Sequence, residues 1–325
     1  MHKNKIIANT FLAGWCADAI GARLEFRQTK IELNEVNDAI HFRGSNSSGV
    51  CPGQYTDDSE MELCLLMGIL DGKNEDFFPI EHIALRYIEW FNSFPFDIGM
   101  TTRNALMGSK NAEDMVNNAF DFNEDSESNG SLMRCIPIAV CGIGKPIDII
   151  LDMAETDASL THYSKTTQLV TGAYCFIISQ ILHHRIKGIK IDVLKLLEET
   201  ENIISKNKKI LSWFVEAIQL TNLDLYDSIK NEGHVKHAFI FVIYFLKNIN
   251  CYNYTSSLQQ VLMCGGDTDT NAKIVGNLFG AFYDNCVPDT ILDVVLNFDC
   301  TKADGYFERP RVYGIHNALQ LINKL

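Results

Sequence analysis

The sequence has few prolines, no long apolar run and no excess of positive charge. Only 7 of its 325 residues are proline and 21 are glycine, so neither a fibrous repeat nor a long disordered stretch is indicated. No stretch reaches the roughly 18 apolar residues that a membrane-spanning helix requires. With 28 basic against 41 acidic residues, the chain also lacks the basic stripe that binds nucleic acid or an anionic membrane surface. We therefore expect neither a nucleic acid nor a membrane as a partner.

Cysteine pairs of the metal-binding kind are also missing. Ten cysteines are scattered between Cys16 and Cys300, and none forms a CxxC pair or a His-flanked cluster, so a zinc site is not indicated. In a chain this long they are expected to be reduced and mostly buried, as in a cytoplasmic protein. The first residues, up to Ala19, share a basic start, an apolar run and a small-residue site with secretory signals. Asn9 and Thr10 interrupt that run, and a signal is the less favoured interpretation.

Apolar side chains recur at helical intervals through most of the chain. This period predicts a first helix over 3–22 and a nearly all-apolar helix over 60–70, which should lie at the centre of the protein. Pro79 is expected to begin an amphipathic helix that runs to Trp90, because proline is favoured in a first turn. Further helices are predicted at 101–108, 112–120, 131–143, 146–156, 163–184, 190–206, 209–220, 235–247, 254–263, 270–284, 288–297 and 313–323.

Strand signals are few and short, so the predicted fold class is all-α. Residues 31–55 have no helical period, and Gly44 to Gly49 has the composition of a loop. No linker rich in proline, glycine or serine divides the chain. We predict one domain over residues 1–325.

Two acidic clusters each stand directly before a predicted helix. The first is Thr56-Asp57-Asp58-Ser59-Glu60, and the second is Gly265-Gly266-Asp267-Thr268-Asp269-Thr270. After the second cluster, Ala272, Gly276 and Gly280 follow at four-residue spacing, which gives that helix a smooth face for close packing. Both helices are therefore expected to be buried, with their acidic ends inside the protein.

Helix capping is the simpler explanation of these clusters. Asp and Thr favour helix starts, and Asp57 with Glu60 has the spacing of a capping box. A cap needs one carboxylate, however, and each cluster has at least two. Crowded carboxylates raise one another's pKa unless a cation neutralises them, and unpaired buried charges cost several kcal/mol each. We therefore favour a metal site.

The ligand types indicate which metal the clusters would hold. Carboxylate and hydroxyl oxygens suit Mg²⁺, Mn²⁺ or Ca²⁺ rather than zinc or copper. An EF-hand that starts at Asp267 is excluded, because Ala272 and Leu278 occupy its glycine and glutamate positions. Four aspartates fit two divalent ions better than one. Two ions about 4 Å apart could clamp a diol and polarise a water molecule.

Other polar segments have both a structural and a functional interpretation. Ser131 is predicted to cap a helix after the Asn129-Gly130 turn, and N–H groups at that helix start could bind phosphate. His162, near another helix start, is more often a structural hydrogen-bonding group than a catalyst. Asp97 would be an ordinary turn residue by default. Glu25 would be an acid at a helix C-terminus, which is an unfavourable position in the helix dipole.

Five blocks of the sequence, taken in order, carry a family resemblance. They are Gly14 to Glu25 with Asp18-Ala19-Ile20-Gly21, Gly53 to Ser59, Asn129 to Pro137, Thr161-His162, and Gly265 to Gly280 with its GGDTDT core. Over about residues 8–283 the chain resembles the ADP-ribosylglycohydrolase family. The resemblance favours a core helix over a signal at the N-terminus. It also implies an all-α fold and a binuclear Mg²⁺ or Mn²⁺ centre.

The resemblance further implies an activity and a set of site residues. The expected reaction is hydrolytic removal of ADP-ribose from modified arginine or serine side chains, or from a related conjugate, and a monomer is favoured. Glu25 or Asp58 is the expected general base or proton shuttle. The implied metal ligands are Thr56, Asp57, Asp58, Asp267, Asp269 and Thr270. The implied ADP-ribose cleft is formed by Asn129, Gly130, Ser131, Met133 and His162, with Asp97 and Gly99 at its rim.

The chain departs from the family pattern in a few places. Ser59 replaces a usual Thr, Ala17 replaces a usual Gly, and no Pro follows His162 closely. Residues 185–260 match nothing in the family pattern, and substrate preference could differ there. None of these departures removes an expected metal ligand.

Two other functions were weighed against the hydrolase. Asp267-Thr268-Asp269 is similar to the nucleophile motif of haloacid-dehalogenase-like phosphatases, but two glycines precede it and Asn271 stands at the fifth position. A catalytically idle relative that binds ADP-ribose is the other alternative, and the intact aspartates argue against it.

Overall fold

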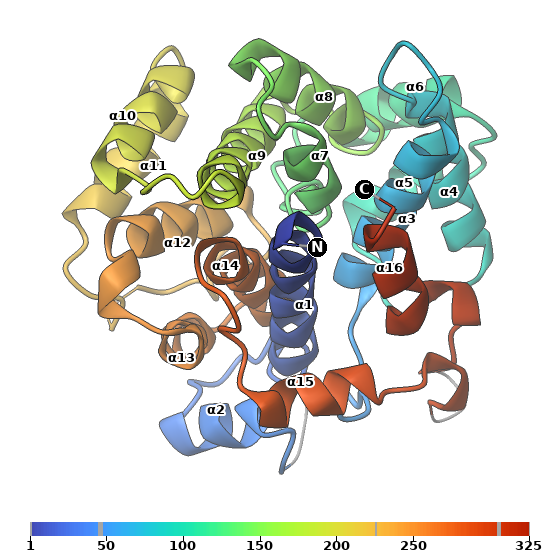
Figure 1. The fold of residues 1–325 in the computed structure, drawn as a ribbon. Coiled ribbons are helices and arrows are strands. Elements are labelled where there is room, and N and C mark those ends of the chain that lie inside the picture. The colour runs from blue at the N-terminus through green and yellow to red at the C-terminus, as the bar shows by residue number, and fades with distance from the viewer. Residues whose placement is uncertain (1, 45–47, 225, 304–306, 325) are drawn as a thin grey trace.

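Two helices that are buried along most of their length lie side by side at the centre of the computed structural model, α1 (His2–Gly21) and α14 (Thr268–Phe282) (Figure 1). The structure describes residues 2–44, 48–224, 226–303 and 307–324. Close approach of the two helices depends on small residues. A Cβ on Gly276 would lie 2.7 Å from the carbonyl oxygen of Ala13, and one on Gly280 would lie 2.6 Å from the Cβ of Ala13. The predicted smooth face is thus the contact between α1 and α14.

Three more apolar helices complete the core. They are α3 (Asp57–Asp71), α9 (Lys165–Ile186) and α12 (Val235–Lys247), and α3 is the central helix expected from residues 60–70. Side chains of all five helices belong to one hydrophobic cluster. A core built from helices of both chain ends fixes the N-termini of α3 and α14, and with them the two acidic clusters.

Shorter helices surround this core, and most of them bury a single face. They are α2 (Leu33–Ile40), α4 (Ile80–Asn92), α5 (Met100–Leu106), α6 (Ala112–Asn123), α7 (Ile136–Cys141), α8 (Ile147–Ser159), α10 (Val193–Ile204), α11 (Lys208–Gln219), α13 (Tyr254–Cys264), α15 (Asp289–Leu296) and α16 (Ile315–Ile322), with 3₁₀ turns η1 (Ile249–Cys251), η2 (Cys300–Lys302) and η4 (Arg311–Tyr313). Over the described ranges the only β-type pairing is one isolated bridge, between Ser128 and His234. The all-α prediction is confirmed.

Two local predictions were wrong. Helix α2 lies in the segment 31–55, where no helical period was found, because eight residues are too few to establish one. The helix expected over 131–143 begins at Ile136, so Ser131 does not cap it. Pro137 explains the difference, since proline is tolerated in a first turn but breaks a helix interior. Of the loop predicted from Gly44 to Gly49, residues 45–47 lie outside the described residues.

The cysteines agree with the sequence-based expectation. All ten cysteines are free thiols, and six of them are buried. Within the described ranges, no helix combines the length and the apolar character needed to cross a bilayer.

Candidate functional site

A cavity of about 370 Å³ opens where the N-termini of α3 and α14 meet. Asp57 and Asp58 reach it from the first turn of α3, and Asp267 and Asp269 reach it from the start of α14. A hydrogen bond joins the two clusters, because the Thr270 hydroxyl donates to Asp58 Oδ2 at 3.1 Å. The structure therefore brings together two clusters that are about two hundred residues apart in the sequence.

The lining of this cavity is strongly acidic. Among its described lining residues there are seven carboxylates and no lysine, arginine or histidine: Glu25, Asp57, Asp58, Asp97, Glu232, Asp267 and Asp269. Burial, reinforced by repulsion from the neighbouring carboxylates, raises the pKa of Asp57, Asp58 and Asp269 well above the ordinary range. The same causes raise the pKa of Glu25 to about 10 and that of Asp97 to about 6. A cation in the cavity would reverse these shifts by favouring the ionised forms.

Oxygen atoms suitable for a cation are already close together. Glu25, Asp267 and Asp269 each place one carboxylate oxygen within 4.8 Å of the other two. Oδ1 of Asp58 is buried and has no hydrogen-bond partner in the structure. Hard oxygen donors of this kind are the ligands that Mg²⁺ and Mn²⁺ prefer. These oxygen donors therefore fit a divalent cation, and the Glu25 carboxylate is one of them.

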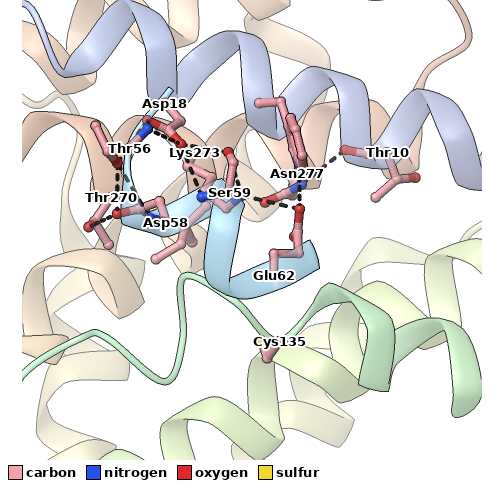
Figure 2. A network of polar contacts seen from close by, with 12 residues as sticks. Thr10, Asp18, Thr56, Asp58, Ser59, Glu62, Cys135, Thr270, Lys273 and Asn277 are labelled. Atoms are coloured by element: carbon pink, nitrogen blue, oxygen red, sulfur yellow. Dashed lines mark hydrogen bonds and ion pairs between the residues drawn. The ribbon is translucent and has the colours of Figure 1, made fainter. Parts of the chain in front are cut away.

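Asp18, on α1, fixes the turn that carries the first cluster (Figure 2). Its carboxylate accepts hydrogen bonds from the backbone N–H and hydroxyl of Thr56 at 3.0 Å each, and from those of Ser59 at 3.2 and 2.5 Å. Asp18 is fully buried. Asp18 belongs to the first family block, but no role was predicted for it from the sequence. A single aspartate at the end of a largely apolar helix was the signal that could have found it.

The capping explanation holds for Thr56 and not for Asp57. Thr56 is the N-cap of α3, and its hydroxyl accepts from the N–H of Asp58 at 3.4 Å. Glu60 does not close the expected capping box, because its carboxylate binds the guanidinium of Arg309 and the indole N–H of Trp90. Capping thus uses one hydroxyl and leaves Asp57 and Asp58 to face the cavity.

The turn around Asn129 forms a second wall. Asn129, Gly130 and Met133 line the cavity, and the Asn129 amide donates to Asp267 Oδ2 at 2.8 Å. Ser131 faces away from the cavity, where its hydroxyl pairs with that of Thr171 at 2.9 Å. The expectation of a phosphate-binding helix start at Ser131 fails, because residues 129–134 form turns.

His162 lies one layer behind that wall. Its Nδ1 pairs with the hydroxyl of Thr161 at 2.7 Å, and its Nε2 pairs with that of Ser128 at 2.9 Å. Its ring contacts the position that a side chain on Gly130 would occupy. Burial lowers the His162 pKa well below its usual range, so the ring is neutral. This environment matches the structural interpretation, in which His162 supports the turn.

Loops supply the rim of the cavity. Asp97 and Gly99 line it from the connection between α4 and α5. Glu232 and Gly233 also line it, although they belong to the segment 185–260 in which no family motif was found. The N–H of Asn129 donates to the carbonyl of Gly233 at 3.0 Å, beside the Ser128–His234 bridge. This pairing connects residues far apart in the sequence, so no local signal could have revealed it.

Comparisons with known proteins identify the family of the chain. The sequence model of the family described as ADP-ribosylglycohydrolase matches residues 3–315. The chain is 28% identical over 319 residues to a protein of Acanthamoeba polyphaga mimivirus named "Putative ADP-ribosyl glycohydrolase", covering 90% of this chain and 92% of that protein. It is 27% identical to the ADP-ribosyl-[dinitrogen reductase] glycohydrolase of Rhodospirillum rubrum, over 84% of each chain.

A further bacterial relative and a solved structure extend the comparison. The chain is 24% identical to the ADP-ribosylarginine hydrolase Tri1 of Pseudomonas putida, covering 82% of this chain and 67% of that protein. A solved chain titled "ADP-ribosylglycohydrolase-related protein complex" shares the fold, with a TM-score of 0.72 and 20% identity over 99% of this chain and 97% of its own. The chain belongs to the ADP-ribosylglycohydrolase family, whose members hydrolyse the glycosidic bond of ADP-ribose.

Proposed function

We propose that the chain removes ADP-ribose from modified arginine side chains with two bound divalent cations, Mg²⁺ or Mn²⁺. One observation carries the proposal: the buried side chains of Asp58, Asp267 and Asp269 converge with Glu25 on a single acidic cavity. The names of the Rhodospirillum and Pseudomonas relatives support an ADP-ribosylated protein and an arginine linkage. The acidic lining suits a cationic guanidinium better than a neutral serine oxygen. Serine-linked ADP-ribose is the second candidate and can be tested in the same assay.

The proposed ligands of the cations are Thr56, Asp57, Asp58, Asp267, Asp269 and Thr270. Bound divalent cations would supply Lewis acidity, lowering the pKa of a water molecule and orienting the ribose hydroxyls. Two neighbouring side chains position these ligands. Asp18 holds the Thr56–Ser59 turn in place, and Asn129 holds the Asp267 carboxylate. Thr56 does not line the cavity, so its proposed contribution is the least direct.

Glu25 and Asp58 are the two candidates for moving a proton. Without a cation, the raised pKa of Glu25, about 10, keeps it protonated. Added positive charge favours its carboxylate, which can then accept a proton from the attacking water. The bond between C1″ of the distal ribose and the side-chain nitrogen breaks through an oxocarbenium-like state. The acidic lining stabilises the positive charge of that state.

The remaining cavity residues are proposed to bind ADP-ribose. Asp97, Gly99, Asn129, Gly130 and Met133 line the cavity and can contact the ligand directly. Ser131 and His162 are proposed to act indirectly. Ser131 anchors the Asn129–Arg134 turn through its hydrogen bond to Thr171, and His162 binds Ser128, the residue directly before that turn.

The activity is tested by measuring free ADP-ribose released from arginine- and serine-linked ADP-ribosyl peptides. We expect release from the arginine-linked peptide with Mg²⁺ or Mn²⁺, complete loss of release in EDTA, and recovery when Mn²⁺ is added in excess. Release that persists unchanged in EDTA would refute the metal proposal. Release from the serine-linked peptide alone would replace arginine as the substrate.

Cation binding is also expected to stabilise the protein in a pH-dependent way. The folded-state pKa values of Asp97 and Glu25, about 6 and 10, exceed their ordinary values of 3.8 and 4.5. The stability that these groups contribute by holding protons is therefore present at low pH and lost as the pH rises through the folded-state values. A cation displaces those protons, so its stabilising effect grows with pH.

The measurement is the melting temperature with and without Mn²⁺ at pH 5.5 and pH 7.5. The same Mn²⁺ concentration is used at both pH values; where it is a hundredfold above the dissociation constant, the cation adds about 2.7 kcal/mol. We expect a clearly larger increase in melting temperature at pH 7.5 than at pH 5.5. Equal increases at the two pH values would contradict the proposed competition between protons and cations.

A further inference from the structure

Lys273 is a buried cation that lies close to the site but does not line its cavity. It stands on α14, four residues after Asp269, and its side chain has no solvent exposure. A buried charge of this kind is costly unless it is paired and fully hydrogen-bonded. The proposed reaction makes no use of Lys273, so its presence needs a separate explanation.

The ammonium group of Lys273 contacts two residues of α3 (Figure 2). It donates to the hydroxyl of Ser59 at 3.1 Å and to Oε2 of Glu62 at 3.2 Å. Glu62 also accepts the indole N–H of Trp15 at 2.6 Å. Lys273 therefore joins α14 to α3 one turn away from the acidic ends of both helices.

The direction of the hydrogen bond between Lys273 and Ser59 follows from the chemistry of the ammonium group. An ammonium group can only donate, so the Ser59 oxygen must accept from Lys273. The single proton of the Ser59 hydroxyl is then left for Asp18, whose Oδ2 lies 2.5 Å away. Asp18 in turn accepts the N–H and the hydroxyl of Thr56. A continuous chain of hydrogen bonds thus runs from Lys273 to the turn that carries Asp57 and Asp58.

Lys273 is the positive charge that acts on Asp18 through Ser59. Among the described residues, no lysine or arginine forms a direct ion pair with it, and its hydrogen-bond donors are the neutral groups of Thr56 and Ser59. Lys273 is the cation at the far side of Ser59. We propose that Lys273 is a positioning residue that holds the Thr56–Ser59 turn in its cation-binding shape through Ser59 and Asp18.

This inference rests on the proposed metal site, and the rival explanation is that Lys273 merely neutralises Glu62. The two explanations make different predictions for variants of Ser59 and Glu62, the two residues that the Lys273 ammonium group contacts. Lys273→Met removes both contacts. Ser59→Ala removes the hydroxyl that joins Lys273 to Asp18 and keeps the ion pair with Glu62, whereas Glu62→Gln removes the ion pair and keeps that hydroxyl. The dissociation constant of Mn²⁺, measured by titration calorimetry without substrate, is the main readout, with the melting temperature of the cation-free protein beside it.

We expect Lys273→Met and Ser59→Ala to weaken Mn²⁺ binding about tenfold, the lower end of the range for residues that support metal ligands. Glu62→Gln should lower the melting temperature and leave the Mn²⁺ dissociation constant unchanged. If Lys273→Met does not fold, Lys273→Met/Glu62→Gln replaces it, because that double variant leaves no unpaired buried charge.

Two outcomes would overturn the inference while the metal proposal stands. One is parental Mn²⁺ affinity in the Ser59 and Lys273 variants, and the other is an equal loss of affinity in Glu62→Gln. Failure of the parent protein to bind Mn²⁺ at all would instead refute the metal proposal, and this inference with it.

Discussion

Replacing Asp269 with asparagine is expected to abolish ADP-ribose release while the chain stays folded. Asp269 is buried at the start of α14, and its carboxylate lies beside those of Glu25 and Asp267. Loss of residues that merely support metal ligands already costs 10–100-fold in activity or affinity, so loss of a ligand should reduce turnover by at least roughly a hundredfold. Turnover of the arginine-linked peptide at saturating Mn²⁺ is the measurement.

Stability provides a second readout for the same variant. Burial and repulsion raise the pKa of Asp269, so removal of its charge should leave the cation-free melting temperature unchanged or higher. The increase in melting temperature that Mn²⁺ produces in the parent protein should disappear in this variant. Asp289→Asn is the matched control, because Asp289 occupies the first turn of α15 in an exposed position and should leave both quantities unchanged. Full activity in Asp269→Asn would refute the two-cation assignment.

Replacing Arg134 with methionine is expected to cost about 3–5 kcal/mol of unfolding free energy, because it leaves the Asp157 charge buried without its partner. Arg134 and Asp157 are both fully buried, and Nε of Arg134 lies 3.1 Å from Oδ2 of Asp157. The guanidinium also stacks on the ring of Tyr87, whose hydroxyl donates to the same aspartate at 2.7 Å. Denaturant unfolding of the parent protein and of Arg134→Met measures this loss of unfolding free energy.

Arg86→Met is the control for this measurement. Arg86 forms two ion pairs of 2.7 Å, with Asp71 and Glu89, but all three side chains are partly exposed. Exposed pairs of this kind contribute about 1 kcal/mol or less. A loss in Arg134→Met as small as that in Arg86→Met would show that the pair beneath the Asn129–Arg134 turn is not needed to hold it.

The fold could be predicted where the apolar pattern extended over several turns. The buried helices α1, α3, α9 and α14 all have apolar runs long enough to show a helical period. Helix α2 was missed because it has only eight residues, and the start of α7 was placed too early because the constraint from Pro137 was not applied. Both errors concern boundaries and short elements, for which local pattern is least informative.

The site could be predicted where its residues stand in short, chemically distinctive clusters. The aspartates of α3 and α14 were identifiable because repeated carboxylates at buried helix starts have few structural explanations. Glu232 was not identifiable, since a long-range bridge brings it to the cavity. Lys273 was missed for a different reason: lysines in helices are usually exposed, and the burial expected for this helix was not extended to its lysine.

The central pairing of α1 with α14 also determines when activity can arise during synthesis. Asp18 and Asp269 are separated by most of the chain, yet the site needs both helices packed together. A nascent chain on the ribosome therefore has no cavity until the GGDTDT segment has left the exit tunnel. Long-range contacts of this kind slow folding, because distant segments must meet before their contacts stabilise anything. Hydrolase activity should thus appear only after both helices have been made and have packed together.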